Sequence, residues 1–366
     1  MFRHTSNMKL LTFVLAMLLA SSPSLRGQNS VGSTKGSGIE ARLALALKLF
    51  PEADLDQDGN LSMAEGLRFL ESHPELKSML KQKGFSEGKG TSQPADFARG
   101  AEGTKLFVCA HSFMIHTAKM LPAITESAGV AHLNAGQQMI GGSQVIEHWN
   151  LPDETNQAKK ALREGIVDVL TLSPHTLLPD EGIDLFTKLG LEKNPDLRVL
   201  VQASWMPRDG LTGEFSNAAR DAVTTEELRA MCEVYRSGWL SQLETQVTAL
   251  NASVGHDAVH IVPVGDAVLG LRERVAEGTA PGLSQQSELF RDDLGHPAEA
   301  LALLVTYCHF ASIYQRTPVG LPVPDSLKDH SEAEALNHLL QELAWDAVST
   351  YPLSGVKVKE VAVAVE

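Results

Sequence analysis

The chain has 366 residues, of which 43% are hydrophobic, and a formal net charge of −14. A chain of this length and composition can bury a large core, which excludes a disordered protein and favours one sizeable domain with a smaller one. Lys and Arg form no long cluster that could neutralise phosphates, so the sequence argues against a nucleic-acid partner.

The first residues have the pattern of an export signal. Arg3, His4 and Lys9 precede an apolar run over residues 10–20, and small, turn-forming residues follow it. The run is shorter than the roughly 20 apolar residues of a membrane-spanning helix. We therefore expect a signal peptide over residues 1–27, and a mature protein that is secreted or periplasmic and has no stable membrane anchor.

Residues 54–65, DLDQDGNLSMAE, match an EF-hand calcium loop throughout. Such a loop supplies oxygen ligands from positions 1, 3, 5, 7, 9 and 12 and has Gly at position 6, where the backbone turns sharply. Gly59 stands at position 6. The predicted Ca²⁺ ligands are Asp54, Asp56, Asp58, Asn60 through its carbonyl oxygen, Ser62 directly or through water, and Glu65 as a bidentate ligand.

Helical patterns flank this loop, which predicts a small all-α EF-hand unit over residues 39–83. A merely solvated acidic turn would need neither Gly59 nor Glu65. No second loop is visible, so the lone site could bind weakly, pair with its copy in a dimer, or serve structure rather than sensing. An affinity of about 10⁻⁴ to 10⁻³ M would suffice for it outside the cell.

A Gly-, Pro- and Ser-rich stretch over residues 84–103 predicts a linker. From residue 104 to about 325, short apolar runs alternate with helical patterns. The predicted strands lie at 106–110, 138–140, 167–173, 197–204 and 258–264. The predicted helices lie at 158–164, 225–252, 267–277 and 298–315. Such alternation predicts an α/β layered sandwich with a parallel sheet, whose ligands bind at the carboxyl ends of the strands. The rest, 326–366, is predicted to be a helix with a Ser331 and Glu334 capping box, followed by a tail.

Three groups of residues suggest nucleophilic chemistry. Ser112 directly follows the first predicted strand, where a hydroxyl can be exposed at the edge of the sheet. Asp293 and His296 share a polar loop, so the carboxylate can orient an imidazole whose other nitrogen faces a nucleophile. Gly141 and Gly142 follow an apolar turn and leave backbone N–H groups available to an oxyanion. Each group alone is more simply explained by ordinary loop composition.

Taken together and in order, these groups resemble the SGNH (GDSL-like) hydrolase family over residues 105 to about 320. The resemblance implies a flavodoxin-like three-layer α/β/α sandwich and a serine esterase. It also implies that Ser112 is the nucleophile, His296 the base and Asp293 the residue that orients it. Ser112 and Gly142 would donate backbone N–H groups to the oxyanion.

The sequence departs from the family pattern in two blocks. Ala110-His111-Ser112 replaces the usual Gly-Asp-Ser, and the third predicted strand is followed by Ser173-Pro174-His175, with no Asn to complete the oxyanion hole. Ser173 or His175 would have to donate in place of that Asn. The expected function is hydrolysis of acyl esters on a small molecule or a polysaccharide. The alternative is a non-catalytic calcium-binding or scaffold protein that retains the fold.

Cysteine and histidine follow no recognised disulfide or metal spacing. Cys109, Cys232 and Cys308 are an odd number and widely separated, so we expect at least one buried free thiol. Several histidines lie near the predicted strands, and a zinc site is the alternative to hydrogen-bonded loop or core histidines: His111, His116, His132, His148 and His175.

Overall fold

The computed structural model describes residues 103–206, 209 and 215–356, together with the isolated residues Leu47, Asp54 and Gly59. The chain divides into two compact units, Met1–Lys89 and Gly90–Glu366. The division falls inside the predicted linker. The expected signal peptide and most of the expected EF-hand unit, loop included, lie outside the described residues; Leu47, in the first expected helix, is helical.

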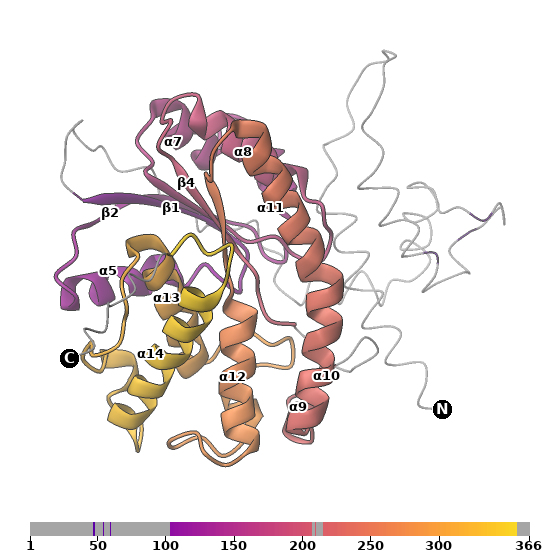
Figure 1. Cartoon of the computed structure of the whole chain (residues 1–366), viewed down its shortest axis with the longest axis vertical. Helices are drawn as coiled ribbons and strands as arrows, with labels where there is room; N and C mark the ends of the chain where they lie inside the picture. The colour runs from indigo at the N-terminus through magenta and orange to yellow at the C-terminus, as the bar shows by residue number, and fades with distance from the viewer. Residues whose placement is uncertain are drawn as a thin grey trace, which may run out of the picture. The chain divides into compact units, whose positions relative to one another are not determined.

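The second unit is built on a five-stranded sheet in which all neighbouring strands are parallel (Figure 1). Its strands are β1 (Thr104–Ala110), β2 (His132–Met139), β3 (Val169–Leu172), β4 (Arg198–Gln202) and β5 (Val259–Val262). Their order across the sheet is β2-β1-β3-β4-β5. The order reverses between β1 and β3, and in sheets of this kind ligands bind beyond the carboxyl ends of strands at that point. The predicted α/β class with a parallel sheet is thus confirmed.

Helices cover both faces of the sheet and make a separate apolar core on each. On one face lie α5 (Thr117–Ser127), α12 (Val264–Ala276), α13 (Glu299–Tyr314) and α14 (Ala333–Thr350). On the other lie α6 (Val145–Trp149), α7 (Gln157–Glu164), α8 (Glu181–Leu191) and α11 (Ser241–Val254). Every residue of β3 is buried, because both faces of a central parallel strand are covered.

The remaining helical segments follow β4 or connect the helices of one face. They are α9 (Asn217–Asp221), α10 (Thr225–Tyr235), the π-helical turn η2 (Arg236–Leu240), and the 3-10 turns η3 (Gln286–Leu289) and η4 (Asp325–Leu327). Consecutive α10, η2 and α11 occupy the single long helix that the sequence predicts. The predicted capping box at its start is confirmed, since Thr224 and Glu227 bond reciprocally.

Several sequence expectations differ from the structure. Strand β2 is longer than predicted, and α8 was not predicted. The capping box expected at Ser331 is wrong, because α14 begins after Glu332 and has no side-chain cap. α14 also packs into the same core as α12 and α13, so it belongs to the helical layer on that face of the sheet.

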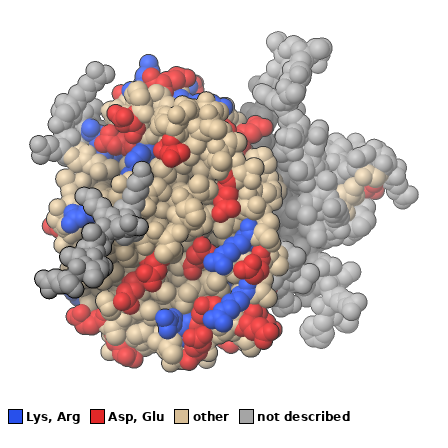
Figure 2. Space-filling model, in the orientation of Figure 1, with Lys and Arg blue, Asp and Glu red and all other residues tan. Residues whose placement is uncertain are grey.

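The described surface is mixed in charge. In the view of Figure 2, acidic and basic side chains are interspersed, without a continuous basic patch on the described residues. None of the described helices is both long enough and apolar enough to span a membrane.

Candidate active site

Ser112 lies in the turn that leaves β1, at the carboxyl edge of the sheet. The backbone N–H groups of Met114 and Ile115 both donate to the His111 carbonyl oxygen, at 3.2 Å each, which closes a tight turn ahead of α5. The His111 N–H donates to Ser173 Oγ at 2.9 Å, so the turn is tied to the end of the neighbouring strand β3. The partly exposed Ser112 side chain is thereby held at the point where the strand order reverses.

His111 is a buried structural group, although it adjoins the candidate nucleophile. Its Nε2 lies 3.3 Å from the Pro174 carbonyl oxygen, and its Nδ1 accepts from the Phe113 N–H at 3.2 Å. A carbonyl can only accept, so Nε2 carries the hydrogen and the ring is neutral. Burial, followed by the nearby His175, lowers the pKa of His111 to about 3. His111 therefore holds the loops after β1 and β3 together as a neutral ring.

The structure brings Ser112 and His296 together from positions 184 residues apart in the chain. His296 Nε2 lies 2.9 Å from Ser112 Oγ, and His296 Nδ1 lies 2.7 Å from Asp292 Oδ2. The carboxylate can only accept, so Nδ1 carries the hydrogen and Nε2 is free to accept the hydroxyl proton. These three side chains have the mutual geometry of a nucleophile, its base and the group that orients the base.

The acid in this arrangement is Asp292, which corrects the expected Asp293. Residues 291–296 form a hairpin turn, in which Arg291 N–H donates to the His296 carbonyl oxygen and Gly295 N–H to that of Asp292. This turn directs Asp292 toward the imidazole. The carboxylate of Asp293 instead accepts from the Asn217 N–H at 3.0 Å. Because the two aspartates are identical and adjacent, the sequence does not show which one bonds His296. The conformation of the turn decides it.

The electrostatic setting keeps Asp292 ionised. Burial favours the neutral acid, but hydrogen bonds from the His296 side chain and backbone outweigh it, and they hold the pKa of the Asp292 carboxyl below its ordinary value. The side chain of Asp292 is 42% exposed, so water also solvates the carboxylate. Asp292 therefore remains a negatively charged acceptor for His296 at neutral pH.

Aromatic packing fixes the loop that carries His296. The rings of Phe113 and Trp205 stack with centroids 4.6 Å apart, and the Phe113 ring meets the His296 ring edge-on at 5.5 Å. Trp205 Nε1–H donates to the Gly295 carbonyl oxygen at 3.2 Å. Trp205 is thus a packing residue that anchors the hairpin beside the nucleophile, and it is almost fully buried.

Two backbone N–H groups in the turns that follow β1 and β2, those of Ser112 and Gly142, are available to a ligand. The Ile140 N–H donates to the Ala110 carbonyl oxygen at 3.2 Å, so the turns that follow β1 and β2 start side by side. Among the described residues, no acceptor receives the N–H of Ser112 or of Gly142. Gly142 has φ +64°, a conformation that favours glycine. These amides can stabilise negative charge on a carbonyl oxygen attacked by Ser112.

The two residues expected to replace the family's Asn have different environments. Ser173 is buried and its Oγ accepts from the His111 N–H, so it ties two strand ends together. His175 is half-buried, and its backbone N–H donates to Gln144 Oε1 at 3.1 Å. The His175 ring lies edge-on to that of His111, with centroids 5.5 Å apart. His175 is therefore the better placed of the two to reach a substrate.

Two of the described N-terminal residues belong to the predicted calcium loop. Asp54 Oδ2 accepts from the Gly59 N–H at 2.9 Å, and Gly59 has φ +83°, as the sharp turn at position 6 requires. Asp54 Oδ1 is buried and has no hydrogen-bond partner among the described residues. An orphaned carboxylate oxygen fits a Ca²⁺ ligand. The other predicted ligands, Asp56, Asp58, Asn60, Ser62 and Glu65, lie outside the described residues.

The remaining histidines and cysteines of the described part form no metal site. No group of three or more His, Cys, Asp or Glu side chains there could hold a metal ion. All three cysteines are buried and free. Several histidines instead have hydrogen-bond partners within the protein, as with His132, whose Nδ1 lies 2.6 Å from the Tyr314 hydroxyl.

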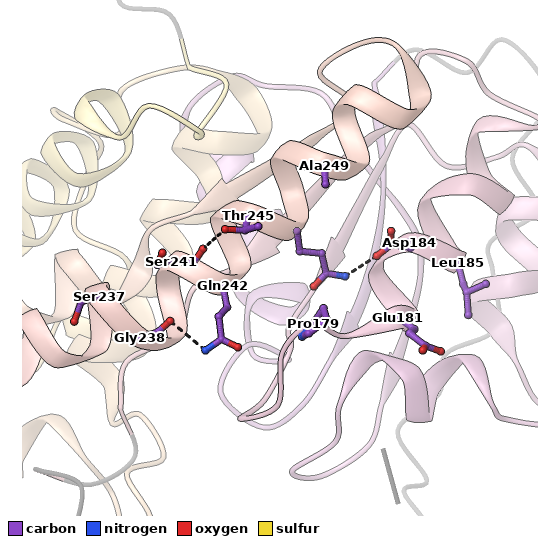
Figure 3. A pocket seen from close by; sticks show the side chains of 11 residues that line it. Pro179, Glu181, Asp184, Leu185, Ser237, Gly238, Ser241, Gln242, Thr245 and Ala249 are labelled. Atoms are coloured by element: carbon purple, nitrogen blue, oxygen red, sulfur yellow. Dashed lines mark hydrogen bonds between the residues drawn. The ribbon is translucent and has the colours of Figure 1, made fainter. Parts of the chain in front are cut away.

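A groove of about 750 Å³ lies elsewhere, between α8 and the helix formed by η2 and α11 (Figure 3). No member of the Ser112, His296 and Asp292 group lines it. Both of its glutamine side chains bond within the protein: Gln246 Nε2 donates to Asp184 Oδ2 at 2.5 Å, and Gln242 Nε2 to the Gly238 carbonyl oxygen at 3.3 Å. The candidate active site is therefore the edge of the sheet at Ser112.

Comparison of the chain with protein-family models, with curated proteins and with solved structures found no match.

Proposed function

We propose that the protein is an exported serine ester hydrolase whose catalytic residues are Ser112, His296 and Asp292. The observation that carries the proposal is the continuous hydrogen-bonded series from Ser112 Oγ through the imidazole to the carboxylate, at 2.9 and 2.7 Å. The strand order 2-1-3-4-5 is that of flavodoxin-like sheets, which supports the resemblance to SGNH hydrolases. That resemblance also suggests acyl esters of a small molecule or a polysaccharide as substrates.

In this mechanism, Ser112 Oγ attacks the acyl carbon and His296 Nε2 takes the hydroxyl proton. The carbonyl electron pair moves onto oxygen, where the N–H groups of Ser112 and Gly142 receive the charge. Collapse of this intermediate breaks the ester bond, and His296 returns the proton to the departing alcohol. Water then attacks the acyl-enzyme, again losing its proton to His296, and releases the acid and the free Ser112 hydroxyl.

A serine-reactive fluorophosphonate tests this proposal without knowledge of the natural substrate. We expect the full chain to be labelled at Ser112 and the Ser112→Ala variant to be unlabelled, because the reagent captures only an activated serine. Ser127→Ala is a matched control. Ser127 lies at the opposite end of α5, where its hydroxyl donates to the Ile124 carbonyl oxygen.

Labelling that persists in Ser112→Ala, or its complete absence from folded wild-type protein, would overturn the esterase. The second of these results would favour a non-catalytic scaffold that retains the fold.

We also propose that residues 54–65 bind one structural Ca²⁺. The support is the complete ligand pattern in the sequence and the Asp54–Gly59 hydrogen bond, beside which Asp54 Oδ1 has no partner among the residues that the structure describes. When bound, the ion would be held by the oxygen atoms of Asp54, Asp56, Asp58, Asn60, Ser62 and Glu65. Together with residues 1–27, this site suits a secreted or periplasmic location, where calcium is plentiful.

Calorimetric titration with calcium tests the second proposal. We expect one site with a Kd on the order of 10⁻⁴ to 10⁻³ M, and its loss in Glu65→Gln, because that change removes the bidentate carboxylate. Glu75→Gln makes the same change of charge outside the loop and should leave the titration unchanged. Equal binding heats in wild type and Glu65→Gln would show that the loop is not the site.

A further inference from the structure

A series of buried hydrogen bonds leads to the loop that carries Gly142. Gln138 Nε2 lies 3.2 Å from His148 Nδ1, and His148 Nε2 lies 2.9 Å from Ser143 Oγ. Ser143 Oγ also lies 3.0 Å from the Ile140 carbonyl oxygen. Gln138, Ser143 and His148 are each at most 1% exposed. The series therefore forms a buried polar connection between strand β2, helix α6 and the turn that follows β2.

The direction of every hydrogen bond in this series is determined. The Ala158 N–H donates to Gln138 Oε1, so the amide nitrogen of Gln138 must face His148 and donate to its Nδ1. The hydrogen of the neutral imidazole then lies on Nε2 and is donated to Ser143 Oγ. The Ser143 hydroxyl hydrogen goes to the Ile140 carbonyl, which can only accept. His148 thus cannot act as a base toward Ser143, although the pair resembles a Ser-His dyad.

Ile140 is consequently held through both of its backbone polar groups. Its N–H donates to the Ala110 carbonyl oxygen at the end of β1, and its carbonyl accepts from Ser143. The far side of the turn is held as well, because the Val145 and Ile146 N–H groups donate to the Asp180 carboxylate at 2.6 and 2.9 Å. The segment between these attachments contains Gly141 and Gly142.

We propose that Ser143 and His148 are positioning residues, which hold the Gly142 N–H at the place where charge develops during attack by Ser112. This inference rests on the proposed esterase. A histidine that only stabilised the core could donate to any buried acceptor. His148 instead donates to Ser143, which bonds Ile140, the residue that links the Gly-Gly turn to β1. A misplaced oxyanion donor loses most of its effect, because the hydrogen bond must be made in the transition state.

The test compares Ser143→Ala with Ser312→Ala. Ser312 is a matched control: its hydroxyl is likewise buried and donates to one backbone carbonyl, that of Cys308, at 3.0 Å. Both variants should lose stability against urea, and Ser143→Ala should lose more, because it leaves the buried His148 Nε2–H without its acceptor. Only Ser143→Ala should slow fluorophosphonate labelling, by about 10- to 100-fold. With a chromogenic acyl ester, it should lower kcat by a similar factor and leave KM within about threefold.

Equal labelling rates in the two variants would overturn the positioning role while leaving the esterase intact. Failure of wild type to label would instead remove the esterase itself, so the two failures are distinguishable. If Ser143→Ala does not fold, His148→Gln replaces it in the same comparison. An unchanged labelling rate in folded His148→Gln would also overturn the proposal.

Discussion

Replacing Asp292 by Asn should lower kcat for ester hydrolysis by about 10²- to 10³-fold. The Asn amide group can donate a hydrogen to His296 Nδ1, which stabilises the tautomer whose Nε2 carries the hydrogen. An imidazole in that state cannot accept the proton of Ser112. The loss is expected to be smaller than for a fully buried acid, because the Asp292 side chain is 42% exposed and water partly replaces it. Steady-state hydrolysis of a chromogenic acyl ester measures the effect.

Asp293→Asn is the matched control, since it makes the same chemical change one residue later. Asp293 Oδ1 accepts from the Asn217 N–H, and an amide oxygen can accept there equally well. We expect kcat to change by less than about threefold. If Asp293→Asn were the damaging variant and Asp292→Asn the mild one, the hairpin geometry assigned to the catalytic loop would be wrong.

Mild acid should unfold the α/β unit. Three fully buried histidines remain neutral in the folded protein, and burial lowers the pKa of each to about 3: His111, His148 and His309. In the unfolded chain a histidine has a pKa of about 6.5, so the unfolded state binds more protons at any pH between these values. Stability is therefore complete above pH 6.5 and is lost as pH falls toward 3.

Each of these histidines contributes a slope of about 1.4 kcal/mol per pH unit. Burial lowers the pKa of His116 and His260 to about 4, so they add to this slope, while burial raises the pKa of Asp180 to about 6, so Asp180 opposes it. Below pH 6 the net fall in the free energy of unfolding is therefore about 5 kcal/mol per pH unit. That is a large part of the total stability of an ordinary domain. Urea unfolding at several pH values measures the slope. All four tryptophans, Trp149, Trp205, Trp239 and Trp345, lie in the α/β unit, so their fluorescence reports that unit alone.

His148→Gln supplies the control for the acid prediction, because it removes one of the titrating groups. Its slope should be smaller than that of wild type by about 1.4 kcal/mol per pH unit, whatever its stability at pH 7.5. A wild-type urea midpoint that stays constant between pH 7.5 and 5.5 would contradict the assignment of these histidines as neutral buried groups.

The sequence predicted the α/β class and the location of the site for physical reasons that act locally. The run 106–110 and the central residues 199–201 of the run 197–204 are apolar throughout, because both faces of a central parallel strand are covered. A polar residue directly after such a strand must lie at the edge of the sheet, which placed Ser112 correctly. Strand β2 and helix α8 were harder to read. The Gln residues of β2 include the buried Gln138, whose polar groups bond His148 and Ala158, both outside the strand.

By itself, the sequence determined a parallel α/β domain, a serine at the edge of its sheet, a late histidine that could serve it and a complete calcium-loop pattern. Tertiary structure alone decided that His296 reaches Ser112 and that Asp292, not Asp293, orients the imidazole. It also decided that Ser143 and His148 support the Gly-Gly turn. The reason is that hydrogen-bond direction depends on how turns close in space. The sequence alone does not show which partner each of two adjacent aspartates bonds, or whether a Ser donates to a His five residues away or accepts from it. Packing decides both.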